Sequence, residues 1–146
     1  MPLLEDNGRM TTTGGSDWPR VDDSARCPCL SGASYGSCCG PLHRGEALPP
    51  SAERLMRSRF SAYVMGNVRY LLATWHPTTK PSTLELDPDQ KWYLLDVVHT
   101  SRGGMLDTQG TVEFTAKYRY AGRAGEQHEN SRFVKEKRRW YYLDAM

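Results

Sequence analysis

The chain has 146 residues, of which 38% are hydrophobic and 25% are charged, and its formal net charge is +2. This length fits one small domain with a modest core and an appended module. So small a net charge gives no reason to expect a specific nucleic-acid partner. No stretch approaches the roughly 20 apolar residues that span a bilayer, and the N-terminus lacks the apolar core of a secretory signal. We therefore expect a cytoplasmic protein with no membrane partner and with reduced thiols.

Residues 1–25 are predicted to form a disordered leader. They include the run Thr11-Thr12-Thr13-Gly14-Gly15-Ser16 and few apolar side chains. Such a segment buries too little apolar surface to offset the entropy that is lost when its backbone is ordered.

All four cysteines fall within 13 residues, in the pattern C-x-C-x8-C-C formed by Cys27, Cys29, Cys38 and Cys39. Two close pairs separated by a turn can bring four thiolates to one point, and zinc accepts four thiolates tetrahedrally. A structural zinc site contributes on the order of 10–16 kcal/mol, which the few apolar side chains of this segment cannot supply. We expect one structural Zn²⁺ ion, without which the segment is unfolded.

Disulfide or redox chemistry and inert cysteines are the alternatives. A bridge within the vicinal pair Cys38-Cys39, or between Cys27 and Cys29, would be strained, whereas bridges between the two pairs stay open. A reducing cytosol argues against either kind. His43 is the one spare ligand nearby, and we interpret it as a support for a ligand or as unrelated to the site.

Helical spacing begins after a connector at residues 41–50. Ser51 is a suitable N-cap for a first helix and Gly66 a natural stop, while Pro77 ends a second, shorter helix. The apolar positions at helical spacing are Met56, Phe60, Tyr63 and Val64 in the first helix, and Val68, Leu71, Leu72 and Trp75 in the second. Residues 77–90 are predicted to form a loop.

From Lys91 onward the pattern alternates with period two. It predicts four strands, at residues 92–100, 111–120, 127–135 and 140–144. It also predicts two turns, at residues 103–104 and 122–125. Helices followed by an antiparallel meander indicate an α+β domain over residues 51–146, with the helices packed on one face of a curved sheet.

The third predicted strand mixes polar and apolar side chains on both faces, so alternation does not say which face is inside. In one arrangement His128 and Arg132 line a polar cavity and Phe133 packs outward. In the other, a bulge re-aims part of the strand.

The cysteine segment resembles the SEC-C motif, the zinc-binding tail first noted in the SecA translocation ATPase. Residues 27–45 read C-P-C-x-S-G-x-x-Y-x-x-C-C-G-P-x-H-x-G. Later segments are similar to the YchJ family, namely Leu55–Tyr63, Tyr70–Pro77, Val112–Phe114, His128–Phe133 and Trp140–Asp144. The resemblance covers residues 26–144. It implies zinc ligation by the four cysteines, a SEC-C-like zinc module over residues 26–45 and a cone-shaped domain of the nuclear-transport-factor-2-like (NTF2-like) superfamily.

Domains of that superfamily often bind small molecules in the cone. The main candidates for a pocket are Tyr63, Trp75, His76, His128 and Arg132, and His99, Glu113 and Glu129 are further polar candidates. Trp75 is better explained as a core residue, His76 as a residue at a helix end, and Glu113 as an exposed one.

Two functions follow from this pattern. In the preferred one the protein is a non-enzymatic adaptor, whose zinc module engages a protein partner or the ribosome and whose main domain is a scaffold or a ligand-binding cone. The resemblance also implies a homodimer through the sheet as a common mode of pairing. In the other it is a small-molecule enzyme of the isomerase or dehydratase type that transfers protons through His76, His128 and Arg132. No nucleophile motif, phosphate loop or open metal site supports the enzyme independently.

Overall fold

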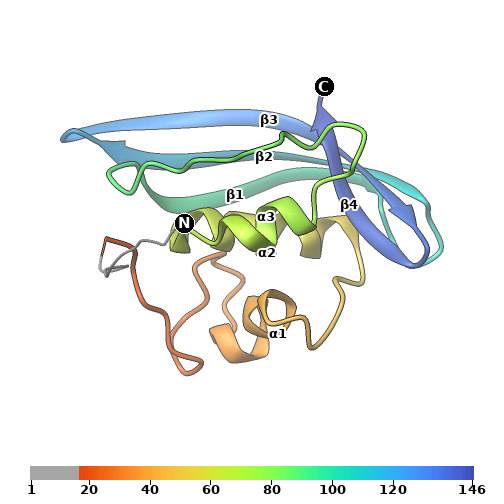
Figure 1. Ribbon diagram of the computed structural model, residues 1–146, viewed down its shortest axis with the longest axis horizontal. Helices are drawn as coiled ribbons and strands as arrows, with labels where there is room; N and C mark the ends of the chain where they lie inside the picture. Colours follow the sequence, from red (N-terminus) through yellow and green to blue (C-terminus); the bar gives the residue numbers. More distant parts are fainter. Residues whose placement is uncertain (1–16) are drawn as a thin grey trace.

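The protein is built in three layers, which a computed structural model describes over residues 17–146. A curved four-stranded sheet forms the first layer, a long helix with a shorter one packed beside it lies on its concave face, and the cysteine-containing segment lies on the far side of the long helix (Figure 1). The middle layer therefore touches both the sheet and the cysteine segment.

Helix α2, Ala52–Met65, is the main helix of the middle layer. The Ser51 side chain accepts a hydrogen bond from the Arg54 N–H at 3.1 Å, and the helix ends at Gly66 with a φ of 71°. These are the N-cap and the left-handed C-cap that the sequence predicts. The short helix α3, Val68–Ala73, follows at once and is capped by the side chain of Asn67.

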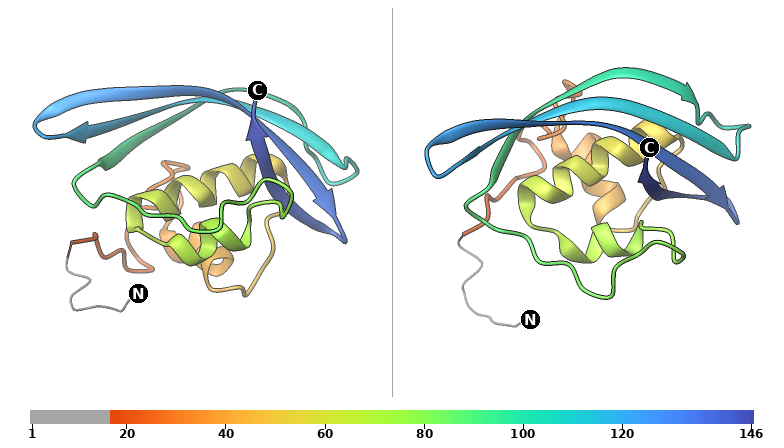
Figure 2. Two further views of the ribbon diagram at one scale, coloured as in Figure 1. Left: turned by 45° about the horizontal axis from the view of Figure 1, so that its top comes forward. Right: turned by 90° about the horizontal axis from the view of Figure 1, so that it is seen from above.

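The sheet is an antiparallel meander with the strand order β1-β2-β3-β4. Its strands are β1, Lys91–Arg102; β2, Gln109–Tyr120; β3, Arg123–Glu136; and β4, Arg139–Ala145. Each strand overlaps its predicted range, and no helix or strand lies between α3 and β1, where the loop was predicted. The last strand, β4, turns toward the helices at one end of the sheet (Figure 2).

The turn between β2 and β3 is tighter than the predicted one at residues 122–125. Only Ala121 and Gly122 lie between the two strands, and both have positive φ, at 52° and 78°. Gly125 belongs to β3 instead. A Cβ there would lie 2.6 Å from the ring of Tyr118, so this glycine provides space for a neighbouring aromatic side chain.

Trp75 lies beyond the helix in which it was predicted. Helix α3 ends at Ala73, and Trp75 makes a parallel bridge with Tyr142 of β4. The Tyr142 N–H donates to Thr74 O and the His76 N–H donates to Tyr142 O, each at 2.8 Å. The chain after α3 thus joins the edge of the sheet because β4 offers it backbone hydrogen bonds.

The core lies between α2 and the concave face of the sheet. Leu55, Met56 and Phe60 of α2 are buried, and buried residues of the sheet include Val112, Phe114, Phe133 and Trp140. The burial of alternate residues in β2 confirms the predicted facing of that strand. The α+β class and the packing of helices on one face of a curved antiparallel sheet are as predicted.

Part of the predicted leader, residues 1–25, belongs to the folded structure. The carbonyl of Asp23 accepts a hydrogen bond from the Gly36 N–H at 2.9 Å, and that of Ala25 accepts one from the Tyr35 N–H at 2.8 Å. Val21 packs against the cysteines. The prediction of disorder is therefore wrong for this part, because its backbone pairs with the cysteine segment. The rest of that prediction, residues 1–16, falls outside the described residues.

Candidate functional site

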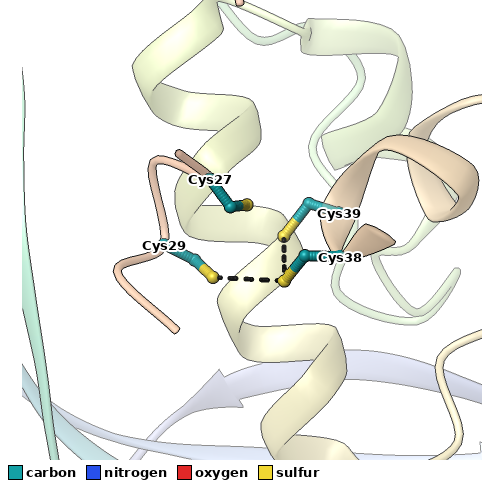
Figure 3. Close-up of side chains that lie close together, drawn as sticks. All are labelled: Cys27, Cys29, Cys38 and Cys39. Carbon is teal, nitrogen blue, oxygen red and sulfur yellow. Dashed lines mark hydrogen bonds between the residues drawn. The ribbon is translucent and has the colours of Figure 1, made fainter. Parts of the chain in front are cut away.

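The four cysteines form a compact buried cluster. Their sulfur atoms lie within 4.8 Å of one another and point toward a common centre (Figure 3). Cys27, Cys29 and Cys39 are fully buried and Cys38 is 5% exposed. Cys38 and Cys39 come from the short helical segment that includes α1, Cys39–His43, whereas Cys27 and Cys29 come from the preceding loop.

The distances between the sulfur atoms fit a four-thiolate metal centre. A tetrahedral site with metal–sulfur bonds of about 2.3 Å has sulfur–sulfur edges of about 3.8 Å. The Sγ atoms of Cys29 and Cys38 are 3.6 Å apart, and those of Cys38 and Cys39 are 3.9 Å apart. All four cysteines are free of disulfides. The cluster therefore has the donor set and the spacing of a metal site with four protein ligands. Such a closed site has no open coordination position for a catalytic water.

The negative charges of thiolates so close together also favour the binding of a cation. Hydrogen bonds from Cys29 and Cys39 lower the pKa of Cys27, while the same contacts and burial raise the pKa values of Cys29 and Cys39. Without a metal, one thiolate therefore suppresses the ionisation of its neighbours. A divalent cation removes that conflict, because it stabilises all four thiolates together.

Helix α2 supports the cluster with polar side chains. The Ser61 hydroxyl, which is buried, donates to Cys39 Sγ at 3.4 Å and lies 3.7 Å from Cys27 Sγ. Arg57 Nη1 donates to the carbonyl of Cys29 at 3.1 Å, and Arg54 Nη2 donates to that of Cys38 at 3.2 Å. Each close pair of cysteines is thus tied to the same helix.

His43 links the cysteine segment to α2 and is not placed as a ligand. Its Nδ1 lies 2.6 Å from the hydroxyl of Tyr35, and its Nε2 lies 2.8 Å from the carbonyl of Ser58. Since a carbonyl only accepts, Nε2 carries the proton and Nδ1 accepts from Tyr35. Burial lowers the pKa of His43, which favours this neutral form.

These supporting residues of α2 were not among the candidates predicted from the sequence. Arg54, Arg57, Ser58 and Ser61 recur every three or four residues, so they form a polar stripe beside the apolar one. Ser58 and Ser61 are completely buried. A polar stripe on a helix that follows a cysteine motif is the signal that could have found them.

A cavity of about 150 Å³ lies between the sheet, helix α2 and the segment after α3. Its lining residues are Met56, Arg59, Phe60, Tyr63, Trp75, Trp92, Phe114, Ala116, Gln127, Glu129, Ser131, Phe133 and Tyr142. Two of the five main candidates, Tyr63 and Trp75, are therefore in the cavity wall, as is Glu129 among the further candidates. Arg59, Gln127, Ser131 and Tyr142 were missed, because no local spacing shows that their side chains face the cavity.

His128 and Arg132 lie outside the cavity, contrary to the first arrangement proposed for the third strand. Glu129, Ser131 and Phe133 face inward, and Phe133 is buried in the core. His128 and Arg132 alternate with them and are 54% and 50% exposed in their side chains. The inward face of β3 is partly polar because it lines the cavity, which is why alternation could not identify it.

The outward side chains make polar contacts between neighbouring strands. His128 Nε2 lies 2.7 Å from a carboxylate oxygen of Glu113, and Arg132 Nη2 lies 2.6 Å from one of Asp144. His99 is exposed on β1 opposite Glu113. These residues meet on the solvent side of the sheet.

His76, the remaining main candidate, is buried but is not part of the cavity lining. Its Nε2 lies 2.9 Å from a carboxylate oxygen of Glu136, and its Nδ1 lies 2.7 Å from the hydroxyl of Thr78. It therefore fastens the segment after α3 to the end of β3. The three residues proposed for proton transfer do not converge.

Comparison with known proteins assigns the family. Residues 51–145 match the family model described as the middle NTF2-like domain of YchJ. The chain belongs to the YchJ family. This match begins at the N-cap of α2 and ends at the last residue of β4, so it covers the helices and the sheet that enclose the cavity.

Relatives of similar length extend the likeness beyond that domain. The chain is 49% identical over 125 residues to a UPF0225 protein of Cupriavidus pinatubonensis, covering 82% of this chain and 86% of the relative. It is 48% identical over 119 residues to one of Streptomyces coelicolor, covering 82% and 93%.

Solved structures of SEC-C motif proteins have the same fold. The solution structure of such a protein from Rhodopseudomonas palustris matches with a TM-score of 0.72 at 33% identity, covering 82% of this chain and 96% of that one. A crystal structure of one from Psychrobacter arcticus matches with a TM-score of 0.68 at 29% identity, covering 84% and 82%. The prediction of a SEC-C-like cysteine segment followed by a cone-shaped NTF2-like domain is confirmed.

Proposed function

We propose that this member of the YchJ family is a non-enzymatic adaptor, held together by one structural zinc ion bound to Cys27, Cys29, Cys38 and Cys39. The observation that supports it is the closed, buried cluster of four sulfur atoms within 4.8 Å of one another. Thiolate sulfur is a ligand that favours zinc, and four such ligands make a structural centre rather than a catalytic one. The zinc module is taken as residues 26–45, followed by the cone-shaped domain at 51–146.

The module is the part that we expect to meet a protein partner or the ribosome. Leu30, between two turns of the cysteine loop, has a φ of 64° and is 43% exposed. A leucine held in the left-handed region and directed to solvent is costly for the isolated protein, and such positions cluster at functional sites. Contact with a partner would bury this side chain.

Partner capture from a cell lysate tests the adaptor. Replacing Cys38 and Cys39 together by serine should abolish zinc binding and capture, while residues 51–146 stay folded by circular dichroism. The matched control is Ser37→Ala, which alters an exposed neighbour in the same loop. Capture by the double cysteine variant at the level of the unaltered protein would overturn the proposal.

The cone cavity is proposed as a binding site for a small molecule and not as a catalytic site. Its walls are mostly apolar and include a few polar side chains, a composition typical of ligand sites. Proton transfer through His76, His128 and Arg132 has no support from the geometry, because all three lie outside the lining.

Localisation and assembly complete the proposal. Four free cysteines suit the reducing cytosol, where we place the protein. Among residues 17–146, no helix has the length and apolar character that crossing a membrane requires.

The exposed Tyr93 and Val98 on the edge strand β1 favour a homodimer through the sheet. Light scattering should give twice the mass of one chain, and Val98→Lys should halve it; a monomer before substitution would exclude the dimer.

A further inference from the structure

The helical wall of the cavity contains a buried guanidinium group. Arg59 of α2 is only 5% exposed and lines the cavity. Its Nη1 donates to the carbonyl of Leu71 and to the hydroxyl of Thr74, both at 2.8 Å. Its Cζ lies 4.9 Å from the ring centre of Trp75 and 4.6 Å from that of Tyr142. The group is therefore fixed in place before any ligand arrives.

No carboxylate within residues 17–146 lies at ion-pair distance from Arg59. In contrast, a Glu or Asp carboxylate lies within 4.0 Å of four other arginines, namely Arg44, Arg57, Arg102 and Arg132. Arginine stays protonated in proteins, and a buried charge without a counter-charge is unfavourable. The two close hydrogen bonds that the guanidinium donates, to Leu71 and Thr74, both come from Nη1, and Tyr63 is its further polar neighbour. Glu129, in the same cavity lining, acts on Arg59 electrostatically but is not at ion-pair distance from it. An anion placed directly on the guanidinium would supply a closer counter-charge and would accept from its remaining N–H groups.

The other walls limit what that anion can be. They are mainly aromatic and apolar, with Phe60, Trp92 and Phe133 among them. The cavity measures about 150 Å³, and an apolar cavity of roughly this size holds a molecule such as benzene. The ligand must therefore have a small apolar body as well as its charged group.

Glu129 defines the opposite, negative side. Its carboxylate accepts hydrogen bonds from the hydroxyls of Ser131 at 2.5 Å and Tyr142 at 3.1 Å, and from the side chain of Gln127 at 2.9 Å. Since these neighbours hold it on β3, its charge repels an anionic group from the strand side. The anionic end of a ligand would lie toward the helices.

We propose that the cavity binds a small organic carboxylate with an apolar body about the size of a benzene ring, with its carboxylate on Arg59. The planar fork of a guanidinium matches a carboxylate, and both oxygens can be held at once. The proposal rests on the assignment of the cavity as a ligand site and names the ligand class.

Three probes of the same shape test this class on the full chain with its metal. Benzoate is the anion, benzamide its neutral analogue and benzylamine a cation. Binding is followed by tryptophan fluorescence, because Trp75 and Trp92 line the cavity, and by NMR shifts. Benzoate should bind at least 10-fold more tightly than benzamide, as expected for a charge-assisted pair of hydrogen bonds, and benzylamine should bind more weakly still.

Variants of the arginine locate the effect. Arg59→Met should abolish the preference for benzoate, Arg59→Lys should retain part of it, and Arg132→Gln, on the outer face, should leave it unchanged. Because Arg59 also holds the C-terminal end of α3, thermal melting checks that each variant folds. If Arg59→Met does not fold, the comparison of the three probes on the unaltered protein decides.

The outcomes separate the two proposals. Equal binding of benzoate and benzamide, tighter binding of benzylamine, or full retention of the preference in a folded Arg59→Met protein would each overturn the anion site but leave a ligand cavity. Failure of all three probes to bind would overturn both the anion site and the ligand cavity.

Discussion

The hydroxyl of Ser61 brings helix α2 into contact with a sulfur atom of the proposed metal site. It donates to Cys39 Sγ at 3.4 Å and is completely buried. A hydrogen bond to a thiolate fixes the orientation of that ligand and lowers the repulsion among the four sulfur atoms.

Replacing Ser61 by alanine should weaken zinc binding by about 10- to 100-fold, the usual effect of removing a group that hydrogen-bonds a ligand. Competition with a chromophoric chelator measures it. Ser37→Ala, at an exposed position next to Cys38, is the control and should have no effect. Equal affinities of the Ser61 variant and the unaltered protein would show that this contact is not used.

His43 gives the contact between the cysteine segment and α2 a dependence on pH. Its pKa is lowered chiefly by burial, so the folded protein binds this proton less readily than the unfolded chain. The stability that depends on neutral His43 is thus fully present above the ordinary histidine pKa of about 6.5, and it is lost as the pH falls below that value.

The variant His43→Gln should be less stable at pH 7.5 by about 1–2 kcal/mol, since two partly buried hydrogen bonds are disturbed. It should also lose less stability than the unaltered protein between pH 6.5 and 5. Urea unfolding at each pH measures both effects, and protonation of the thiolates is common to the two proteins. Parallel pH profiles would count against a neutral, buried His43.

At the scale of elements, α2 carries both candidate sites on different faces. Arg54, Arg57 and Ser61 face the cysteine segment, whereas Arg59 and Tyr63 line the cavity. Both ends of the helix are fixed by capping, so any displacement of α2 moves the cysteine contacts and the cavity wall together.

Arg57→Ala should loosen the cysteine segment. The guanidinium donates to Cys29 O at 3.1 Å and is held by Glu53 of the preceding turn. Its loss should cost about 1.5–3 kcal/mol, the range for a hydrogen bond from a charged group, and should speed the release of zinc to a chelator. Arg69→Ala, at an exposed position on α3, is the matched control. Identical release rates for the two variants would contradict this role.

Elements with local signals could be predicted from the sequence. Ser51 and Gly66 mark the ends of α2 through capping, and the alternation in β2 identifies its buried face. The third strand could not be oriented, because its inward residues include Glu129 and Ser131, which face a partly polar cavity. Trp75 was misplaced, because its partner in β4 is distant in sequence.

At the scale of the whole molecule, the two candidate sites differ in how far the sequence could predict them. The cysteine cluster could be predicted because 13 consecutive residues contain all four cysteines. The cavity combines Arg59, Trp75, Glu129 and Tyr142, which only the fold brings together. No spacing rule connects these positions, so the sequence offered the wrong polar residues, His128 and Arg132, from the opposite face of β3.

Removal of the metal should unfold one layer and leave the others in place. The cysteine segment has a small apolar cluster, whereas the sheet and helices α2 and α3 share the main core. After treatment with a chelator under reducing conditions, NMR signals of residues 26–45 should lose their dispersion and those of the sheet should keep theirs. Loss of dispersion throughout would show that the sheet also depends on the metal.

The central claim is that one zinc ion at Cys27, Cys29, Cys38 and Cys39 organises the segment that packs on α2. Elemental analysis of protein purified without added metal tests it most directly. We predict close to one zinc per chain, and almost none in the variant with Cys38 and Cys39 replaced by serine. Metal-free protein whose residues 26–45 remain ordered by NMR would contradict the account.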